Sequence, residues 1–143
     1  SHLMRTRLSS IRYVRIWCWC MQSDDLDILK AMLSAARRIV KKTEGLTFEQ
    51  FNNDEDILDI CAMQCQIIGN SADSLSVALQ QMYPSIEWED MYGMRCAIAH
   101  SYGTTNFSMK KLWNSVRSDV PELIERLEVI IEDLESGENG SRN

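Results

Sequence analysis

Apolar residues recur at steps of three and four along most of the chain, and this periodicity limits the possible fold more than any other feature. In the segment 23–45, acidic residues precede the apolar positions, two lysines stand near their end and Gly45 follows, as is typical of helix ends. A helix therefore carries the stripe Leu26, Leu29, Leu33, Ala36 and Val40. Alternation with period two is confined to the stretch 13–20, which fits a strand or a helix.

The next segments also follow a helical period. Thr47 and Gln50 have the spacing of a capping box and predict a short helical turn. A long helix is expected from about Asp54 to Met82, in which Gly69 is either a weak point or a site of close packing. Pro84 predicts its end, because the residue before a proline is disfavoured in the helical region.

Three more helices are expected in the remaining chain. Ser85 can cap one that runs to about Gly103, and Pro121 is well placed in the first turn of the last one. Their stripes are Trp88, Met91 and Ile98, then Met109, Leu112, Trp113 and Val116, then Leu123, Leu127, Ile130 and Leu134. The expected fold class is all-α, an up-and-down helical bundle with short connecting loops.

Composition and charge exclude several classes of protein. The chain has 143 residues, 45% of them hydrophobic and 25% charged, which suits one self-sufficient globular domain. A formal net charge of −6 argues against a broad cationic surface, so any contact with RNA must be local. Five cysteines without a secretion signal indicate a reducing, cytoplasmic location, and no apolar run is long enough for a membrane span.

The expected domain organisation has three parts. Residues 1–20 comprise "SHLM", which reads like a cloning remnant, and an extension of unknown role. Residues 21–135 form the helical domain, and 136–143 are expected to be a frayed, disordered tail. With His2 set aside as part of the remnant, His100 is the only native histidine.

That histidine lies in the stretch "MRCAIAHSY", which runs from Met94 to Tyr102. At roughly 100° per residue, Arg95 and His100 stand about 140° apart on an unbroken helix, whereas Arg95 and Tyr102 share a face. Either the helix unwinds near His100 or another chain completes a site. Spacing alone favours a structural explanation, in which His100 caps the helix, Arg95 forms a surface ion pair and Tyr102 packs with its hydroxyl in water.

The same residue types suit the cleavage of RNA by its own 2′-hydroxyl. That reaction needs proton transfer near neutral pH, which imidazole provides, and a fixed cation for the phosphorane, which guanidinium provides. It requires no metal or cofactor. The protons move on opposite sides of phosphorus, so one His100 cannot serve both positions, and a two-fold homodimer would supply a second.

Several blocks of the sequence resemble the HepT-like proteins of the HEPN superfamily. "MRCAIAHSY" is similar to their R-x4-H-x-Y motif. The likeness covers about 21–134 and includes "MQSDDLDILKAMLSAARRIVKKTEGLTFEQF", "CQIIGNSADSL", "YPSIEWEDMYGMR" and "WNSVRSDVPEL". The resemblance implies a HEPN-type bundle that forms a homodimer and acts as a metal-independent endoribonuclease, the toxin of a toxin–antitoxin system.

Residue roles follow from the same resemblance. Arg95 would stabilise the phosphate, His100 would be the catalytic acid and base, and a nucleotidyltransferase antitoxin would silence the nuclease by adding AMP to Tyr102. One departure is Cys96, because the residue after the motif arginine is commonly polar, often Asn. Cys96 therefore favours an alternative function, a non-catalytic HEPN module that dimerises and pairs with a nucleotidyltransferase.

Other signals have mainly structural explanations. Cys18 and Cys20 with Cys61 and Cys65 could hold zinc, but the second pair lies in an apolar stripe, where cysteines behave as small hydrophobes, and no metal is expected. A dyad of Cys96 and His100 would lack an orienting third group. After the motif come Lys110 and Lys111, which form either a positive strip for the phosphate backbone or a solvated helix face.

Overall fold

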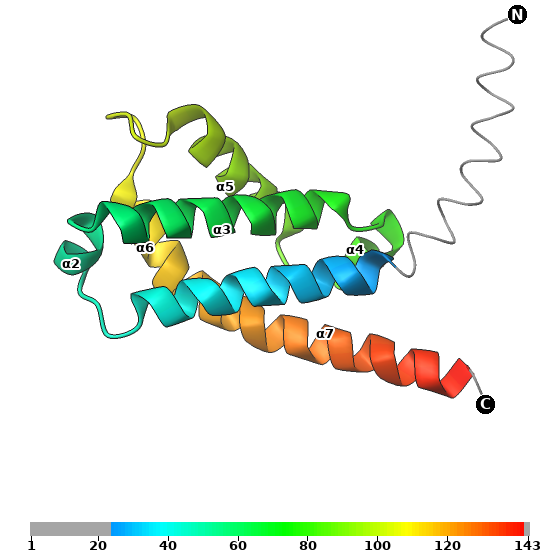
Figure 1. The fold of residues 1–143 in the computed structure, drawn as a ribbon. Helices are drawn as coiled ribbons and strands as arrows, with labels where there is room; N and C mark the ends of the chain where they lie inside the picture. Colours follow the sequence, from blue (N-terminus) through cyan, green and yellow to red (C-terminus); the bar gives the residue numbers. More distant parts are fainter. Residues whose placement is uncertain (1–23, 142–143) are drawn as a thin grey trace, which may run out of the picture.

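Helices make up most of the part of the chain that the structure describes, residues 24–141, and no strand occurs within it. This computed structural model confirms the expected all-α class, and short loops join the helices (Figure 1). None of these helices is long and apolar enough to cross a membrane. In chain order the elements are helix 24–43, α2 (Phe48–Asn52), α3 (Glu55–Ser74), α4 (Val77–Met82), α5 (Trp88–Ser101), α6 (Met109–Asn114), a π turn (Ser115–Asp119) and α7 (Val120–Ser141).

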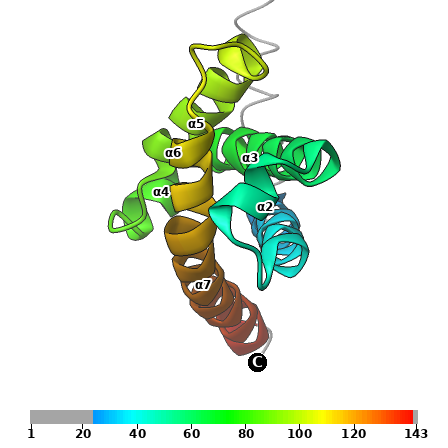
Figure 2. The same cartoon turned by 90° about the vertical axis from the view of Figure 1, so that its left-hand side faces the viewer.

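Neighbouring long helices run in opposite directions, as in an up-and-down bundle. Helix 24–43 lies beside α7, where Lys30 pairs with Glu135 and Arg37 with Glu128, each at 2.9 Å. Figures 1 and 2 show helix 24–43 between α3 and α7, with α5 against the far side of α3. In Figure 2, the loop after α5 stands at the opposite end of the molecule from the C-terminus of α7.

The core joins all of these helices through the predicted apolar stripes. Phe51 is fully buried and packs on Trp113, with 4.9 Å between the ring centroids. The capping box is confirmed, since the Thr47 N–H donates to Gln50 Oε1 at 2.9 Å and the Gln50 N–H donates to Thr47 Oγ1 at 3.2 Å. The side chains most fully buried are Phe51, Leu29, Met32, Ile39, Ile98, Leu112, Leu127, Val116 and Cys61.

The single long helix expected from Asp54 to Met82 is wrong, because the chain leaves the helix at Leu75 and starts α4 at Val77. The cause is a contact from helix 24–43. The buried carboxylate of Asp25 accepts hydrogen bonds from the Ser76 N–H at 2.9 Å and from its Oγ at 2.6 Å. The Ser76 hydroxyl oxygen in turn accepts from the Leu79 N–H and caps α4.

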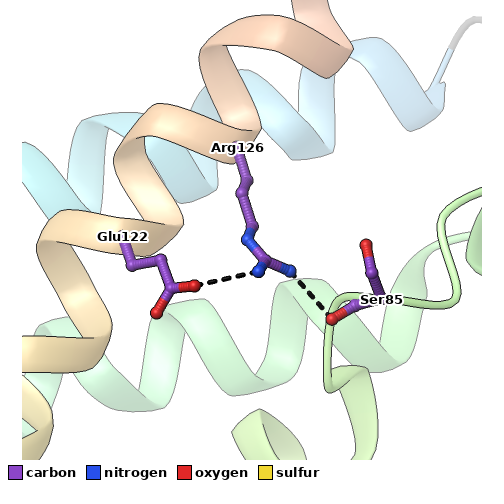
Figure 3. Close-up of polar contacts among 3 residues, drawn as sticks. All are labelled: Ser85, Glu122 and Arg126. Atoms are coloured by element: carbon purple, nitrogen blue, oxygen red, sulfur yellow. Dashed lines mark hydrogen bonds and ion pairs between the residues drawn. The ribbon is translucent and has the colours of Figure 1, made fainter.

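The expected cap by Ser85 is also wrong, since α5 begins after Glu87 without a side-chain cap. Ser85 has another role, shown in Figure 3. Its carbonyl oxygen accepts a hydrogen bond from Arg126 Nη1 at 2.8 Å, while Arg126 Nη2 pairs with Glu122 at 2.9 Å. Arg126 of α7 therefore holds the loop that joins α4 to α5 against α7.

The last two expected helices form one continuous helical run from Met109 to Ser141. A π turn joins them, in which the Val120 N–H donates to the Ser115 carbonyl five residues back. This wider turn lies just before Pro121, whose ring would clash with the carbonyl of a regular α turn. α7 also continues through most of 136–143, where the sequence predicts a tail, because glycine costs a helix only about 1 kcal/mol and no proline interrupts it.

Gly69 is a site of close packing between α3 and α5, one of the two explanations that the sequence left open. A Cβ built there would lie 2.4 Å from the Arg95 Cβ and 2.6 Å from the Met91 carbonyl oxygen. Only a residue without a side chain lets α5 approach α3 this closely. Gly93, in contrast, has open space where its Cβ would be.

We expect Gly69→Ala to lower the free energy of unfolding by up to about 2 kcal/mol, because overpacking costs about 1–3 kcal/mol and helix propensity returns about 1 kcal/mol. Urea unfolding measures this change. The matched control Gly93→Ala, in the middle of α5, should be neutral or stabilising. Equal effects of the two substitutions would contradict the close contact.

Candidate functional site

One face of α3 meets the motif of α5. Asp59, Met63, Ile67 and Asn70 fall within about 80° of one another around the helix axis. Met63 is 59% exposed and Ile67 is 36% exposed. Asp59 and Asn70, eleven residues apart, are separated by about 16 Å along the axis at 1.5 Å per residue. We call these four residues the α3 strip.

Arg95 reaches the Asn70 end of the α3 strip. Its Nε donates a hydrogen bond to Asn70 Oδ1 at 2.7 Å, and its Cβ packs beside Gly69. The guanidinium carbon lies 6.0 Å from the centroid of the Tyr92 ring. Neither terminal nitrogen bonds to another described residue, so both remain available as the planar fork that binds phosphate through two hydrogen bonds. The surface ion pair considered for Arg95 is not formed with any described residue.

Tyr102 reaches the Asp59 end of the α3 strip. Its hydroxyl donates to Asp59 Oδ1 at 2.5 Å, and Phe107 packs edge-on against its ring with centroids 5.7 Å apart. Burial, the hydrogen bond to Asp59 and the negative charge of Asp59 raise the pKa of the Tyr102 phenol well above its usual range. The phenol is therefore protonated at neutral pH. Gly103, with φ +86°, then turns the chain out of α5.

His100 is exposed in the last turn of α5. The helix is regular through Ser101, so the local unwinding considered from the sequence does not occur. Arg95 and Tyr102 both turn toward α3, whereas His100 stands about 140° from Arg95 around the axis of α5. Within one chain, the imidazole and the guanidinium therefore lie on different faces.

The supporting residues suggested by the sequence are spread over two helices. Cys96 is half-buried on α5, and a hydrogen bond with it is the largest cause that raises the pKa of the Tyr92 phenol. Lys110 and Lys111 are exposed on α6, and the Lys110 ammonium lies 4.4 Å from the centroid of the Phe48 ring. Lys110 therefore covers an aromatic side chain of α2.

The cysteines of α3 fit the apolar explanation. Cys61 and Cys65 are buried, and burial raises the pKa of their thiols to about 11 and about 12. Such thiols are protonated at neutral pH and pack as small apolar groups. Within the described part of the chain, no cluster of three potential metal ligands occurs. Cys18 and Cys20 lie outside the described residues.

The sequence analysis missed Asp59 and Asn70. Each is one of several polar residues on α3, and their partners are 43 and 25 positions away, so local spacing does not reveal the pairing. Because they are eleven residues apart, which is about three helical turns, the sequence could have predicted that both lie on the same face of the helix.

The model of the ribonuclease HepT-like family matches residues 32–130, a range that includes the α3 strip and all of α5. This chain belongs to the ribonuclease HepT-like family. The match confirms the resemblance drawn from the R-x4-H-x-Y motif, and it lies inside the expected helical domain 21–135.

Several curated relatives of this chain carry names that point to RNA. The chain is 28% identical over 115 residues to "Putative RNase MJ0127" of Methanocaldococcus jannaschii, which covers 80% of this chain and 90% of the relative. It is 23% identical over 99 residues to "Putative RNase MJ1380" of the same organism (69% and 89% covered). "Putative RNase TTE0752" of Caldanaerobacter subterraneus subsp. tengcongensis is 22% identical over 104 residues (73% and 91% covered). No solved structure matches the HepT-like chain significantly.

In this HepT-like chain, Asp59→Asn should lower the pKa of the Tyr102 phenol, because the substitution removes the negative charge that opposes the phenolate. Ultraviolet absorbance titration of the wild type and the variant, each minus its Tyr102→Phe counterpart, isolates this group. Asp56→Asn, an exposed change on the same helix, is the matched control. If Asp59→Asn leaves the pKa of the Tyr102 phenol unchanged, the hydrogen bond assigned between these two residues is contradicted.

Proposed function

We propose that this HepT-like chain is a metal-independent endoribonuclease and the toxin of a toxin–antitoxin system. Membership of a ribonuclease family and relatives named as RNases support the reaction class. The observation that carries the mechanism is Arg95, whose guanidinium is anchored through Nε and keeps both terminal nitrogens for a ligand. In an acidic protein, this is a local cation of the kind that a single phosphate needs.

The proposed reaction is in-line attack of an RNA 2′-hydroxyl on the adjacent phosphorus. One His100 takes the 2′-hydroxyl proton while the new O–P bond forms, and a second His100 protonates the 5′-oxygen that leaves. The products carry a 2′,3′-cyclic phosphate and a free 5′-hydroxyl. Arg95 stabilises the negative charge of the phosphorane.

A homodimer supplies the second His100 in this mechanism. Within a chain, His100 and Arg95 lie on different faces of α5, so one copy offers a single imidazole and does not aim it at its own guanidinium. Met63 and Ile67 on the α3 strip leave exposed apolar surface, and so does Tyr92 beside Arg95. A two-fold partner placed on the α3 strip would cover this surface and face the two motifs toward each other.

Inhibition by a nucleotidyltransferase antitoxin is part of the same proposal. The partner would add AMP to Tyr102, at the Asp59 end of the α3 strip. The added phosphodiester introduces bulk and negative charge near the path of the RNA backbone, and both oppose substrate binding.

We expect the purified protein to cleave single-stranded RNA in the presence of EDTA. His100→Ala and Arg95→Ala should each lower the rate by about 10²–10⁴-fold, because each removes a group that acts in the transition state. Denaturing gel electrophoresis measures cleavage of the RNA, and sizing of each variant checks that the dimer is intact. Arg38→Ala, an exposed arginine on helix 24–43, is the control and should keep its activity. Undiminished cleavage by both motif variants would refute the mechanism.

Mixtures of wild type and His100→Ala test whether one site uses two copies of His100. If subunits exchange randomly, an equal mixture holds about a quarter wild-type dimers, and activity should follow that fraction. Activity that falls in simple proportion to the wild-type subunits would show that each chain works alone. Exchange is verified by native mass spectrometry of differently tagged subunits.

Cys96 favours a second candidate function, a non-catalytic HEPN module that dimerises and presents Tyr102 to a nucleotidyltransferase. A half-buried thiol at this position cannot hydrogen-bond as an amide would. A growth assay of the unmodified protein distinguishes the two functions, because only the nuclease should arrest growth. Mass spectrometry of the protein made together with the proposed nucleotidyltransferase shows, for either function, whether Tyr102 carries AMP.

A further inference from the structure

The hydroxyl of Tyr102 has one polar partner among the described residues, the carboxylate of Asp59, at 2.5 Å. Packing of α5 on α3 brings these two residues together, although they are 43 positions apart in the sequence. Phe107 packs against the Tyr102 ring in a T-shaped arrangement. The phenol is thus aimed at a single oxygen.

Asp59 is suited to take a proton. An ionised carboxylate only accepts hydrogen bonds, so the shared proton belongs to Tyr102 and the phenol oxygen keeps its lone pairs. None of the ion pairs in the described part of the chain engages Asp59. Asp59 is exposed and Tyr102 is half-buried, and the hydrogen bond between them is open to solvent on the Asp59 side.

A neutral phenol is a poor nucleophile. Like an ordinary tyrosine, Tyr102 is neutral at pH 7, and its raised pKa makes the phenolate rarer still. Attack on phosphorus therefore requires that the proton leave as the new bond forms. The group in contact with that proton is a carboxylate that this chain provides.

We propose that Asp59 is the general base that activates the Tyr102 hydroxyl for nucleotidyl transfer. The Tyr102 oxygen attacks the α-phosphorus of a nucleoside triphosphate and forms an O–P bond. The bond from that phosphorus to the bridging oxygen breaks, pyrophosphate leaves with the electron pair, and the phenolic proton passes to Asp59. The protein that is modified thus contributes a catalytic group to its own modification.

A purely structural role for the hydrogen bond makes a different prediction. A half-buried tyrosine commonly ties its hydroxyl to a neighbour, and removing such a tie would change stability without changing how reactivity depends on pH. Removing a general base instead leaves the ionised phenol as the reactive form, so the rate rises with hydroxide concentration.

Because this role rests on Tyr102 being the acceptor proposed above, the first test uses no transferase. The intact protein is treated with diisopropyl fluorophosphate, whose phosphorus exchanges fluoride for the tyrosyl oxygen, and labelling of Tyr102 is followed by peptide mass spectrometry. Asp59→Asn keeps an acceptor oxygen but cannot take the proton. It should slow labelling at least about tenfold at neutral pH and make the rate rise steadily with pH.

Asp56→Asn is the matched control, since it removes an exposed carboxylate from the same helix and should leave the labelling rate unchanged. Equal rates and equal pH profiles for the wild type and Asp59→Asn would overturn the role of Asp59. Urea unfolding of each variant confirms that the folded protein is being compared.

The second test uses the proposed nucleotidyltransferase partner with ATP. Transfer of AMP to Tyr102 should slow at least about tenfold in Asp59→Asn, and equal transfer to both proteins would also overturn the role of Asp59. Absence of transfer to the wild type would instead refute the acceptor role of Tyr102. The fluorophosphate comparison is independent of that result, so the two failures are distinguishable.

Discussion

The close approach of α5 to α3 at Gly69 is the constraint on which the candidate site depends. Because Gly69 has no side chain, the stem of Arg95 can lie against the backbone of α3, and its Nε can reach Asn70. The same antiparallel contact brings Tyr102 to Asp59 three turns away. A wider spacing between the helices would break both hydrogen bonds together, so one glycine supports both ends of the α3 strip.

The two ends of the α3 strip differ in electrostatic character. At one end, Arg95 offers a positive charge with unused donors next to a neutral amide. At the other, Tyr102 donates to Asp59, and Glu55 adds to the negative field that keeps the phenol protonated. The net charge of −6 averages over this difference, which is why overall composition argues against RNA binding although one end of the site is cationic.

Sequence periodicity predicted the fold where the cause is local. The stripe of helix 24–43 and the capping box at Thr47 depend on residues within a few positions of each other, and both are present. The break at Leu75 depends on Asp25, 51 positions from Ser76, so no local pattern contains it. The motif offers Arg95, His100 and Tyr102 as candidates from local spacing, whereas the contacts with Asn70 and Asp59 become visible only once α3 and α5 are packed.

The π turn at Ser115–Asp119 determines how α7 is rotated about its axis relative to α6. A π turn holds more residues than an α turn, so the stripe of α7 is offset from the one that α6 would continue. Loss of one residue here would rotate α7 by about 100° relative to α6. Glu128 and Glu135 would then turn away from Arg37 and Lys30, and the apolar side of α7 would leave the core. The number of residues in this short segment is therefore constrained by the contacts of α7.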